Sequence, residues 1–398
     1  MTQRNTTDAA AIDAPADAEA GMEEVVATLA AMDRRTVGAG ERGSAAWLAG
    51  RLGELGAEAV TVSTFRGQSS WAPAHLGHVV TAMVVGLLPG RIGRALSLAA
   101  AVSYELEVSG RWQWIRRVLP SRQGASVSAR LPTAGRPSRT LVLVAHHDAA
   151  HNGIVWHPRV VAVNRRWSAR TGRSMPSHLV PLAAMLAAAV PAVPVRRAAA
   201  IVLGIAGLAM TQSMRSYTTP GANDNATGVA AVLETVRHLR AQPLTDTEVI
   251  VVFPGGEEAG NQGMRQWAAD NRGLGGSGRT LVVNLDSLGS GGHLVLARRE
   301  GLTSFAARRD VDTVTRIANE AGIELRAVDF PNVCDAAVAR HAGMRAISVL
   351  SYADGWVEHL HQRSDTADAV GWNTVRAAVT LTEHIARAWD RGAFSNDA

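Results

Sequence analysis

The sequence has no lysine and only one cysteine, Cys334, among its 398 residues. A single cysteine excludes an internal disulfide framework and any metal site built from several thiolates. All 40 basic residues are therefore arginines, and the net charge is only +5. Aromatic residues make up 5% of the chain, and no arginine-rich run alternates with aromatics as a nucleic-acid groove requires. We expect no nucleic-acid partner, and a small buried residue rather than a nucleophile at Cys334.

Two further patterns are missing. The N-terminus has no basic segment followed by an apolar core, as a secretory signal peptide would have. Residues 273–278 are rich in glycine, but no phosphate-loop lysine follows them, which excludes that nucleotide-binding motif. Residues 1–20 are rich in Ala, Asp and Thr and hold few large apolar residues, so we expect a disordered tail before a domain over residues 21–398.

The rest of the chain alternates between strand-like and helix-like patterns. Apolar content is 47%, enough for a large core. Strand-like runs lie at residues 59–65, 125–131, 140–144, 248–253, 280–285, 293–297, 325–330 and 345–350. Helical periodicity lies at residues 226–240, 262–271, 311–321, 335–342 and 372–391, and two more helices are expected within 22–55. This alternation predicts an α/β fold, a three-layer sandwich around a largely parallel mixed sheet.

Five short motifs carry side chains that can bind a metal ion. Four of them stand where a strand-like run has just ended or a helix is about to begin. The motifs are Val144-Ala145-His146-His147-Asp148, Gly221-Ala222-Asn223-Asp224-Asn225-Ala226-Thr227-Gly228, Gly255-Gly256-Glu257-Glu258, Asn284-Leu285-Asp286 and His361-Gln362-Arg363-Ser364-Asp365-Thr366. Imidazole nitrogens and carboxylate oxygens are ligands suited to zinc.

Each motif taken alone also has an ordinary structural explanation. His146 would be a core histidine after a buried strand, and Asp224 would cap the following helix. Glu257 and Glu258 would begin a solvated helix, favoured by the helix dipole, and Asp286 would simply end a strand. The occurrence of all five motifs together favours a metal site.

The order and spacing of these motifs resemble the co-catalytic di-zinc aminopeptidases, a family that includes bacterial leucyl aminopeptidase, vacuolar aminopeptidase Y and, more distantly, glutamate carboxypeptidase II. The resemblance covers roughly residues 25–390, with two interruptions. It implies the zinc exopeptidase fold and two Zn²⁺ ions. It also implies the following roles: Asp224 bridges the metals, His146 and Asp286 complete one site, Glu258 and His361 complete the other, Asp148 orients His146, and Glu257 is the general base.

The chemistry of the paired glutamates supports this division of roles. Adjacent side chains point in different directions, so Glu258 can bind metal while Glu257 reaches the attacking water. A carboxylate beside a ligating imidazole, as Asp148 would be, fixes the tautomer of the ring. Neighbouring residues that lack the family spacing are not expected to bind metal; these are His147, His151, His359 and Glu358.

The preferred interpretation is a zinc-dependent exopeptidase, an aminopeptidase that removes N-terminal residues from peptides. The alternatives are a carboxypeptidase, a glutaminyl-cyclase-like acyltransferase, and a catalytically silent membrane receptor or scaffold on the same fold. The intact Glu257 argues against the silent scaffold. One departure concerns the tyrosine that several relatives place beside the last histidine ligand to stabilise the oxyanion: here that position is Leu360, and Tyr352 is the nearest candidate.

Two hydrophobic insertions, residues 67–118 and 155–216, interrupt the resemblance. Each predicts a helical hairpin, turning at residues 89–91 and at Arg196-Arg197. Three of their four apolar segments reach the lower limit of a membrane span, about 17 residues, and tryptophans flank them. We expect membrane hairpins; the alternative is a buried cap over the site or a homodimer interface, which the prolines of the third segment would suit.

The arginines near the insertions suggest an orientation. Ten lie at the ends that join the catalytic domain, against four at the hairpin tips. The ten are Arg66, Arg111, Arg116, Arg117, Arg122, Arg165, Arg166, Arg170, Arg173 and Arg215, and the four are Arg91, Arg94, Arg196 and Arg197. Because positive charge stays on the cytoplasmic side, we expect an enzyme of the cell membrane with a cytoplasmic catalytic domain.

Overall fold

The computed structural model describes residues 15–88, 90–133, 135–171, 174–176 and 178–394. A mixed nine-stranded sheet stands at its centre, in the order β1-β2-β4-β3-β5-β9-β6-β7, with β8 beside β6. The strands are β1 (Glu58–Gly67), β2 (Arg122–Arg130), β3 (Arg139–Val144), β4 (Thr247–Phe253), β5 (Thr280–Leu285), β6 (His293–Glu300), β7 (Ser304–Phe305), β8 (Leu325–Phe330) and β9 (Arg345–Tyr352).

The four central strands are parallel to one another. β3 pairs with β4 and β5, and β5 pairs with β9, all in parallel. These strands read as nearly continuous apolar runs because helices cover both of their faces. Their carboxyl ends meet at one edge of the sheet, which is where open α/β sheets place their binding sites.

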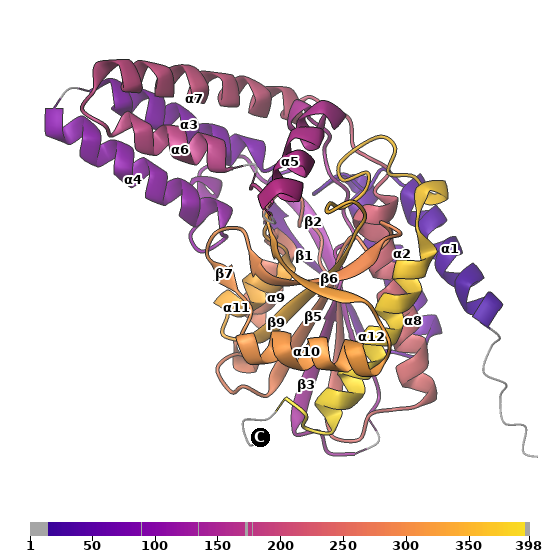
Figure 1. The fold of residues 1–398 in the computed structure, drawn as a ribbon. Coiled ribbons are helices and arrows are strands. Elements are labelled where there is room, and N and C mark those ends of the chain that lie inside the picture. The colour runs from indigo at the N-terminus through magenta and orange to yellow at the C-terminus, as the bar shows by residue number, and fades with distance from the viewer. Residues whose placement is uncertain (1–14, 89, 134, 172–173, 177, 395–398) are drawn as a thin grey trace, which may run out of the picture.

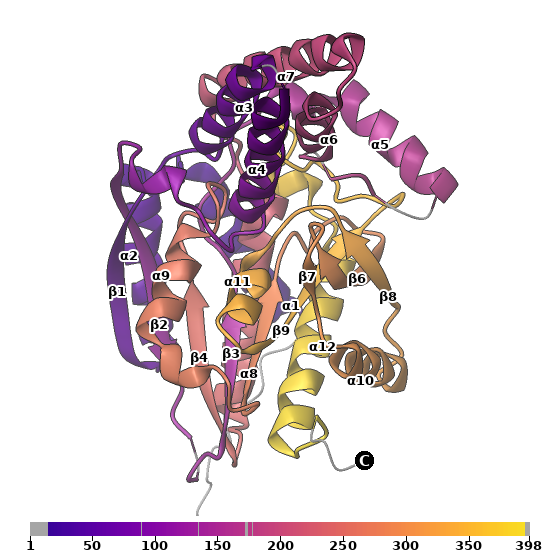
Figure 2. The ribbon, with the colours of Figure 1, turned by 90° about the vertical axis from the view of Figure 1, so that its left-hand side faces the viewer.

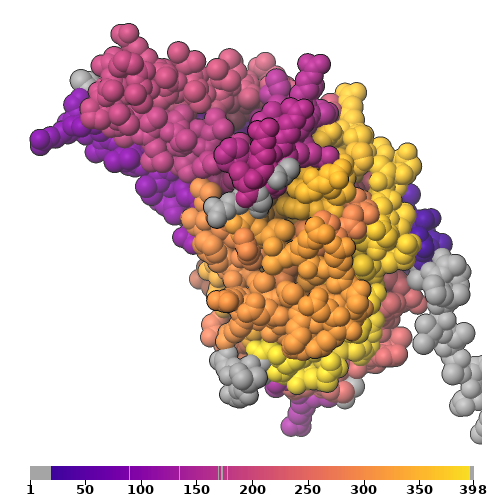
Figure 3. All heavy atoms as spheres, in the orientation of Figure 1, coloured from indigo at the N-terminus to yellow at the C-terminus, as the bar shows by residue number. Residues whose placement is uncertain are grey.

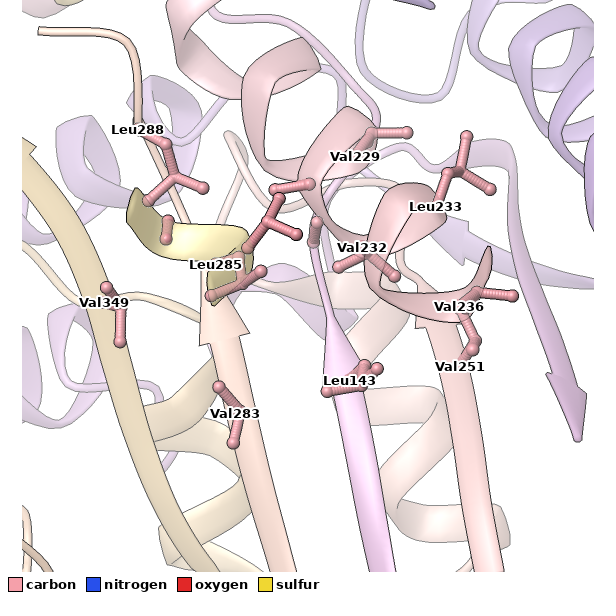
Figure 4. Close-up of a cluster of buried hydrophobic side chains, with 14 of the residues drawn as sticks. Leu143, Val229, Val232, Leu233, Val236, Val251, Val283, Leu285, Leu288 and Val349 are labelled. Atoms are coloured by element: carbon pink, nitrogen blue, oxygen red, sulfur yellow. The ribbon is translucent and has the colours of Figure 1, made fainter. Parts of the chain in front are cut away.

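Helices form a layer on each face of the sheet. On one face Leu141 and Leu143 of β3 pack in a core with α1 (Pro15–Ala31), α2 (Ala39–Glu54), α8 (Thr227–Ala241), α10 (Arg308–Glu320) and α12 (Trp372–Asp390). Figure 4 shows α8 over this core. Val142 and Val144 point to the other face, toward α9 (Gln262–Asp270) and α11 (Asp335–His341). The predicted three-layer α/β fold is therefore confirmed.

The N-terminal boundary needs a correction. Residues 1–14 of the expected tail lie outside the described residues, but residues 15–20 are helical, because α1 begins at Pro15. Farther along this helix, Val26 and Leu29 are fully buried in the main core. Burial of those side chains anchors the helix, and alanines with high helix propensity extend it toward the N-terminus.

The expected hairpins appear as four helices that pack on one another beyond one end of the sheet (Figures 1 and 2). They are α3 (Ala72–Leu87), α4 (Gly90–Val108), α6 (Leu179–Ala188) and α7 (Val193–Met214), and we call them the helical unit. Their shared core includes Val79, Tyr104, Met185 and Leu203. These helices lie within residues 67–118 and 155–216; that the two ranges are insertions stays a prediction.

The second hairpin does not turn where the sequence suggested. Its turn lies between Ala188 and Val193, and Arg196 and Arg197 stand in the first turns of α7. Pro194 explains the difference, because a proline fits the start of a helix, where its missing N–H has no partner to lose. The Arg196 guanidinium instead donates to the carbonyl oxygens of Gly86 and Leu88 and so caps the end of α3.

A further helix, α5 (Pro158–Thr171), was not expected from the sequence. In the space-filling view it covers the junction between the helical unit and the sheet (Figure 3). Among the described residues, one helix is long and apolar enough to cross a membrane: α7, with a mean hydropathy of 1.6 and 22% of its apolar window buried.

Candidate metal centre

The predicted ligands come together at the carboxyl edge of the parallel strands. His146 and Asp148 follow β3, Glu257 and Glu258 follow β4, and Asp286 follows β5. Asp224 precedes α8, and His361 lies in the segment after β9. Three groups of possible ligand atoms, each within 4.8 Å of one another, are formed by His146, Asp224 and Asp286, by Asp224, Glu258 and His361, and by His146, Glu257 and Glu258.

Asp224 lies between the two histidines. Its Oδ1 is 3.2 Å from His146 Nε2, and its Oδ2 is 3.1 Å from His361 Nε2. The same His361 nitrogen is 3.1 Å from Glu258 Oε2. Each oxygen of one carboxylate thus faces a different imidazole, as a carboxylate that bridges two metal ions would.

The donor set fits divalent cations. Glu258 Oε1 is buried and has no hydrogen-bond partner within the described part of the chain. Burial raises the pKa of Glu258 to about 7; His361 opposes this shift and Asp224 adds to it. Burial also raises the pKa of Glu257 well above its ordinary value; His146 opposes this shift and Glu258 adds to it. Carboxylates crowded together in this way are stabilised in their charged form by a cation, and histidine nitrogens with carboxylate oxygens are zinc donors.

Asp365 holds the segment that carries Asp224. Its carboxylate accepts hydrogen bonds from the backbone N–H groups of Asn223 (2.6 Å) and Asp224 (3.1 Å). The peptide bond between Asp224 and Asn225 is cis. On the other side, the Asn225 amide donates to the Leu285 carbonyl at 2.9 Å, which ties the segment to the end of β5. In the sequence Asp365 served only as a spacing marker for His361; in the structure it positions Asp224.

Asp148 contacts more of the site than the sequence predicted. Its Oδ1 is 3.5 Å from His146 Nδ1, which agrees with the expected orienting role. The same carboxylate accepts hydrogen bonds from the backbone N–H groups of Glu257 (3.1 Å) and Glu258 (3.2 Å) and from the Thr36 hydroxyl (2.7 Å). Asp148 therefore positions the glutamate pair as well as the histidine.

Sequence reasoning missed Arg34. Its side chain is fully buried and donates to the carbonyl oxygens of His147 (3.0 Å), Pro220 (2.8 Å) and Gly221 (2.7 Å). Burial lowers its pKa to about 10, against the attraction of nearby carboxylates. Arg34 thus joins the loop of His146 to the loop of Asp224. In the sequence it stands beside Asp33 and Arg35 and has no feature that distinguishes it from a surface arginine.

Glu41 was missed as well. Its carboxylate is buried and accepts hydrogen bonds from the backbone N–H groups of Val37 (2.9 Å), Ala125 (3.0 Å) and Gly256 (3.0 Å). Burial raises its pKa to about 8, and the Asp148 carboxylate adds to this shift. Because Gly256 directly precedes Glu257, Glu41 fixes the turn that presents the glutamate pair.

The neighbouring histidines have other partners. His147 Nδ1 lies 2.8 Å from the Ser44 hydroxyl and its Nε2 lies 3.0 Å from the Ala125 carbonyl oxygen. His151 contacts the Ser216 carbonyl and His359 the Ser364 hydroxyl. Glu358 accepts a hydrogen bond from Arg165 of α5. None of these four belongs to the three groups of possible ligands found among the described residues.

Asn261 and Asp335 surround Glu257. The Asn261 amide donates to Glu257 Oε1 at 2.8 Å and to Asp335 Oδ1 at 3.1 Å. Burial raises the pKa of Asp335 to about 7, an effect that His146 opposes. The preceding Cys334 is buried, as expected, and burial raises the pKa of its thiol.

The centre lies in a pocket of about 650 Å³. Its wall includes Trp156, whose ring centroid is 4.3 Å from that of His361, and side chains of α5, α6 and α7. Tyr352, the sequence candidate for oxyanion stabilisation, is instead buried against Phe330 and does not belong to the pocket wall.

Comparison with known proteins finds a similar family and similar folds. Residues 209–386 match the model of peptidase family M28. This part of the chain is therefore similar to the M28 peptidases. The matched range contains Asp224, Glu257, Glu258, Asp286 and His361, and the resemblance to zinc aminopeptidases and the expectation of a zinc metallopeptidase are confirmed.

Solved structures share the fold of this chain at low sequence identity. An aminopeptidase from Aneurinibacillus sp. strain AM-1 is 14% identical, with a TM-score of 0.56 and 94% of both chains covered. A Zn-dependent exopeptidase from Parabacteroides distasonis is 14% identical, with a TM-score of 0.56, and covers 92% of this chain and 97% of its own. A glutaminyl cyclase from Bacteroides thetaiotaomicron is 15% identical, with a TM-score of 0.54, covering 93% and 97%. No curated protein sequence matches significantly.

Proposed function

We propose that this chain is a di-zinc aminopeptidase that hydrolyses the N-terminal residue of peptides, with Glu257 as general base. The observation that carries the proposal is the placement of Asp224, which belongs to two three-residue groups of possible ligands, one with His146 and Asp286 and one with Glu258 and His361. A single metal would leave two of these five residues without a role.

When bound, zinc ions supply Lewis-acid polarisation of the scissile carbonyl and lower the pKa of a water molecule. Glu257 accepts the proton of that water and delivers it to the leaving amine. The Asn261 amide holds Glu257 Oε1, so the second carboxylate oxygen is the one free to take the proton. Asp148 holds the backbone of Glu257 and Glu258 and thereby sets the distance between base and ligand.

The alternatives to aminopeptidase activity share the site but differ in substrate. A carboxypeptidase acts on N-blocked peptides, a glutaminyl cyclase acts on N-terminal glutamine, and a silent scaffold acts on neither. We would measure zinc per chain together with turnover of leucyl anilide, N-acetylated peptides and glutaminyl peptides. Two zinc ions and turnover confined to free-amino substrates are expected; cleavage of the N-acetylated peptides or cyclisation of glutamine would contradict the proposal.

We also propose that the helical unit associates with a lipid bilayer. Of the described residues, all but three of the exposed large apolar side chains lie within residues 67–118 and 155–216, the exceptions being Val62, Ile154 and Phe305. Monomeric soluble proteins rarely expose an apolar surface of this extent, so we expect a partner or a bilayer to bury it. The ten residues of α6 extend only about 15 Å, half of a hydrocarbon core, so immersion of the unit suits its shape better than four separate spans.

The proposed orientation places the catalytic domain in the cytoplasm at the cell membrane. The excess of arginines on the domain side of the hairpins supports this orientation. Arg116 and Arg165 contribute less to that excess than the sequence suggested, because they pair with Glu107 and Glu358. The alternative cover is a second copy of this chain, which would make a homodimer.

Fractionation distinguishes a bilayer from a homodimer. If the helical unit enters lipid, the protein should sediment with membranes, resist salt and carbonate, and dissolve in detergent. Active dimers of uniform size in the soluble fraction, without detergent, would show that a second copy covers this surface instead.

A further inference from the structure

The pocket above the metal centre continues into the helical unit along an apolar path. α7 contributes five lining residues, Val202, Ile205, Ala206, Ala209 and Met210. Their spacing places them on one face of the helix. Eight steps separate the first from the last, so at 1.5 Å per residue this lined stretch is about 12 Å long.

This path runs from the interior to an exposed apolar surface. Met210 is 5% exposed, whereas Ile205, one turn earlier on α7, is 63% exposed. Val163 of α5 also lines the pocket and is 57% exposed. At the inner end α7 packs on the short helix Ile154–Trp156, whose Trp156 lies against His361. The pocket therefore joins the metal centre to the apolar surface at Ile205 and Val163.

The path offers no hydrogen-bond partners from α7, because all five of its lining side chains are apolar. The polar side chains of the pocket near α4 serve other contacts: Glu107 and Arg116 pair with each other, and Gln113 donates to the backbone carbonyl of Gly260. A peptide backbone lying along α7 would lose its hydration with no replacement from that helix, which costs free energy for each group left unpaired. An alkyl chain has no such groups and gains about 0.8 kcal/mol for each buried methylene.

We propose that the substrate is an amphiphilic amide: a free-amino head that reaches the metal centre, and an unbranched alkyl chain that lies along α7 and emerges at Ile205 and Val163. This proposal rests on the aminopeptidase function above. The reaction is amide hydrolysis, in which the oxygen of water bonds to the carbonyl carbon, the C–N bond breaks, and the leaving amine takes a proton.

Two substrate series test the proposal on the full-length protein in detergent. In one, leucine is joined to alkylamines of four, eight and twelve carbons; in the other, 2-aminoalkanoic acids of increasing length are joined to aniline. We expect kcat/KM to rise with chain length in one of the two series, by up to about fourfold per methylene, the equivalent of 0.8 kcal/mol. The series that responds identifies which end of the substrate carries the chain.

Ile205→Asn and Ile201→Asn form a matched pair of variants. Both residues lie on α7 and are 63% and 64% exposed, but only Ile205 lines the pocket. Ile205→Asn should remove most of the chain-length dependence while leucyl anilide turnover is retained, and Ile201→Asn should leave both unchanged. Equal effects of the two variants would mean that chain length acts only through partition into detergent, and would overturn the proposal.

Other outcomes separate this inference from the proposed function. Hydrolysis of leucyl anilide with no chain-length response in either series would refute the amphiphilic substrate and leave the aminopeptidase intact. Better turnover of oligoleucine peptides than of alkyl amides of equal length would show that an apolar peptide occupies the path instead. If the zinc-loaded protein hydrolysed no free-amino substrate at all, the proposed aminopeptidase function itself would be refuted.

Discussion

A buried ion pair connects the helical unit to the loop that carries the glutamate pair. Arg116 Nε donates to Glu107 Oε1 of α4 at 2.5 Å, and the two side chains are only 7% and 0% exposed. A second nitrogen of the guanidinium donates to the carbonyl oxygen of Ala259, directly after the glutamate pair. Gly260 has a φ of +102°, and a Cβ there would lie 2.7 Å from the guanidinium. We therefore predict that Glu107→Gln loosens this loop.

The expected loss of stability in Glu107→Gln follows from the burial of this ion pair. Removing one partner of a buried ion pair costs about 3–5 kcal/mol, because the remaining charge stays buried and unpaired. Glutamine keeps an acceptor oxygen for Arg116, so we expect a smaller loss, about 2–3 kcal/mol of the free energy of unfolding. Displacement of the loop by a fraction of an ångström should lower kcat at least about tenfold, since misplacement by 1 Å costs about a hundredfold.

The assay combines chemical unfolding, zinc content and kcat on leucyl anilide. The matched control is Glu248→Gln, whose partner Arg130 is 56% exposed, and whose loss should cost no more than about 1 kcal/mol. Zinc content should be unchanged in both variants, because neither residue is a predicted ligand. Destabilisation of Glu107→Gln with normal kcat would refute the positioning of the loop, and unchanged stability would refute the energetic role of the ion pair.

The remaining predictions concern the metal centre and pH. Glu257→Gln should retain zinc and lose at least about a hundredfold in turnover, measured by zinc analysis and kinetics; full activity would exclude Glu257 as base. Asp224→Asn should lower zinc content in the same analysis, because one bridging carboxylate serves two ions. His238 pairs with Glu234 and Glu383, which raise its pKa above 6.5, so this stabilisation is complete below pH 6.5 and lost as the pH rises through the folded-state value. Since His238 and Glu383 are half-buried, His238→Gln should cost only about 1 kcal/mol of the free energy of unfolding at pH 6 and less at pH 9. An equal cost at both pH values would contradict the assignment.

Much of the fold was predictable because the central strands are buried on both faces. Residues 280–285 were predicted as a strand, and β5 has those bounds and is buried along its whole length. The ligand motifs could be assembled for the same reason: parallel strands bring their carboxyl ends together, so residues far apart in sequence meet at one edge. The two-residue strand β7 is too short to leave a periodic pattern in the sequence.

The supporting residues could not be predicted, because their roles depend on contacts between distant segments. Arg34 binds the carbonyls of Pro220 and Gly221, nearly two hundred residues away, and Glu41 binds the N–H of Gly256. In a single sequence, Arg34 and Glu41 cannot be distinguished from the exposed charged residues that are common near helix ends. The prediction of the second hairpin turn was wrong for a different reason. It placed the turn at Arg196-Arg197, whereas Pro194 marks the start of α7, and a proline near a helix start is the stronger signal.

The path of the chain implies that the helical unit and the metal centre are mechanically connected. The segment from α5 to α7 begins after Asp148 and ends shortly before Asp224, so both of its ends are fixed to residues of the site. Asn152 strengthens this connection, because its amide donates to the His361 carbonyl at 2.7 Å and its own carbonyl accepts from Ser213 near the end of α7 at 3.1 Å. A displacement of α7 would therefore move the backbone of a predicted ligand directly. Among the described residues α7 is also the one helix long and apolar enough to cross a membrane. The lipid contact proposed for its exposed face would therefore act on the same helix whose inner end is connected to the predicted ligands.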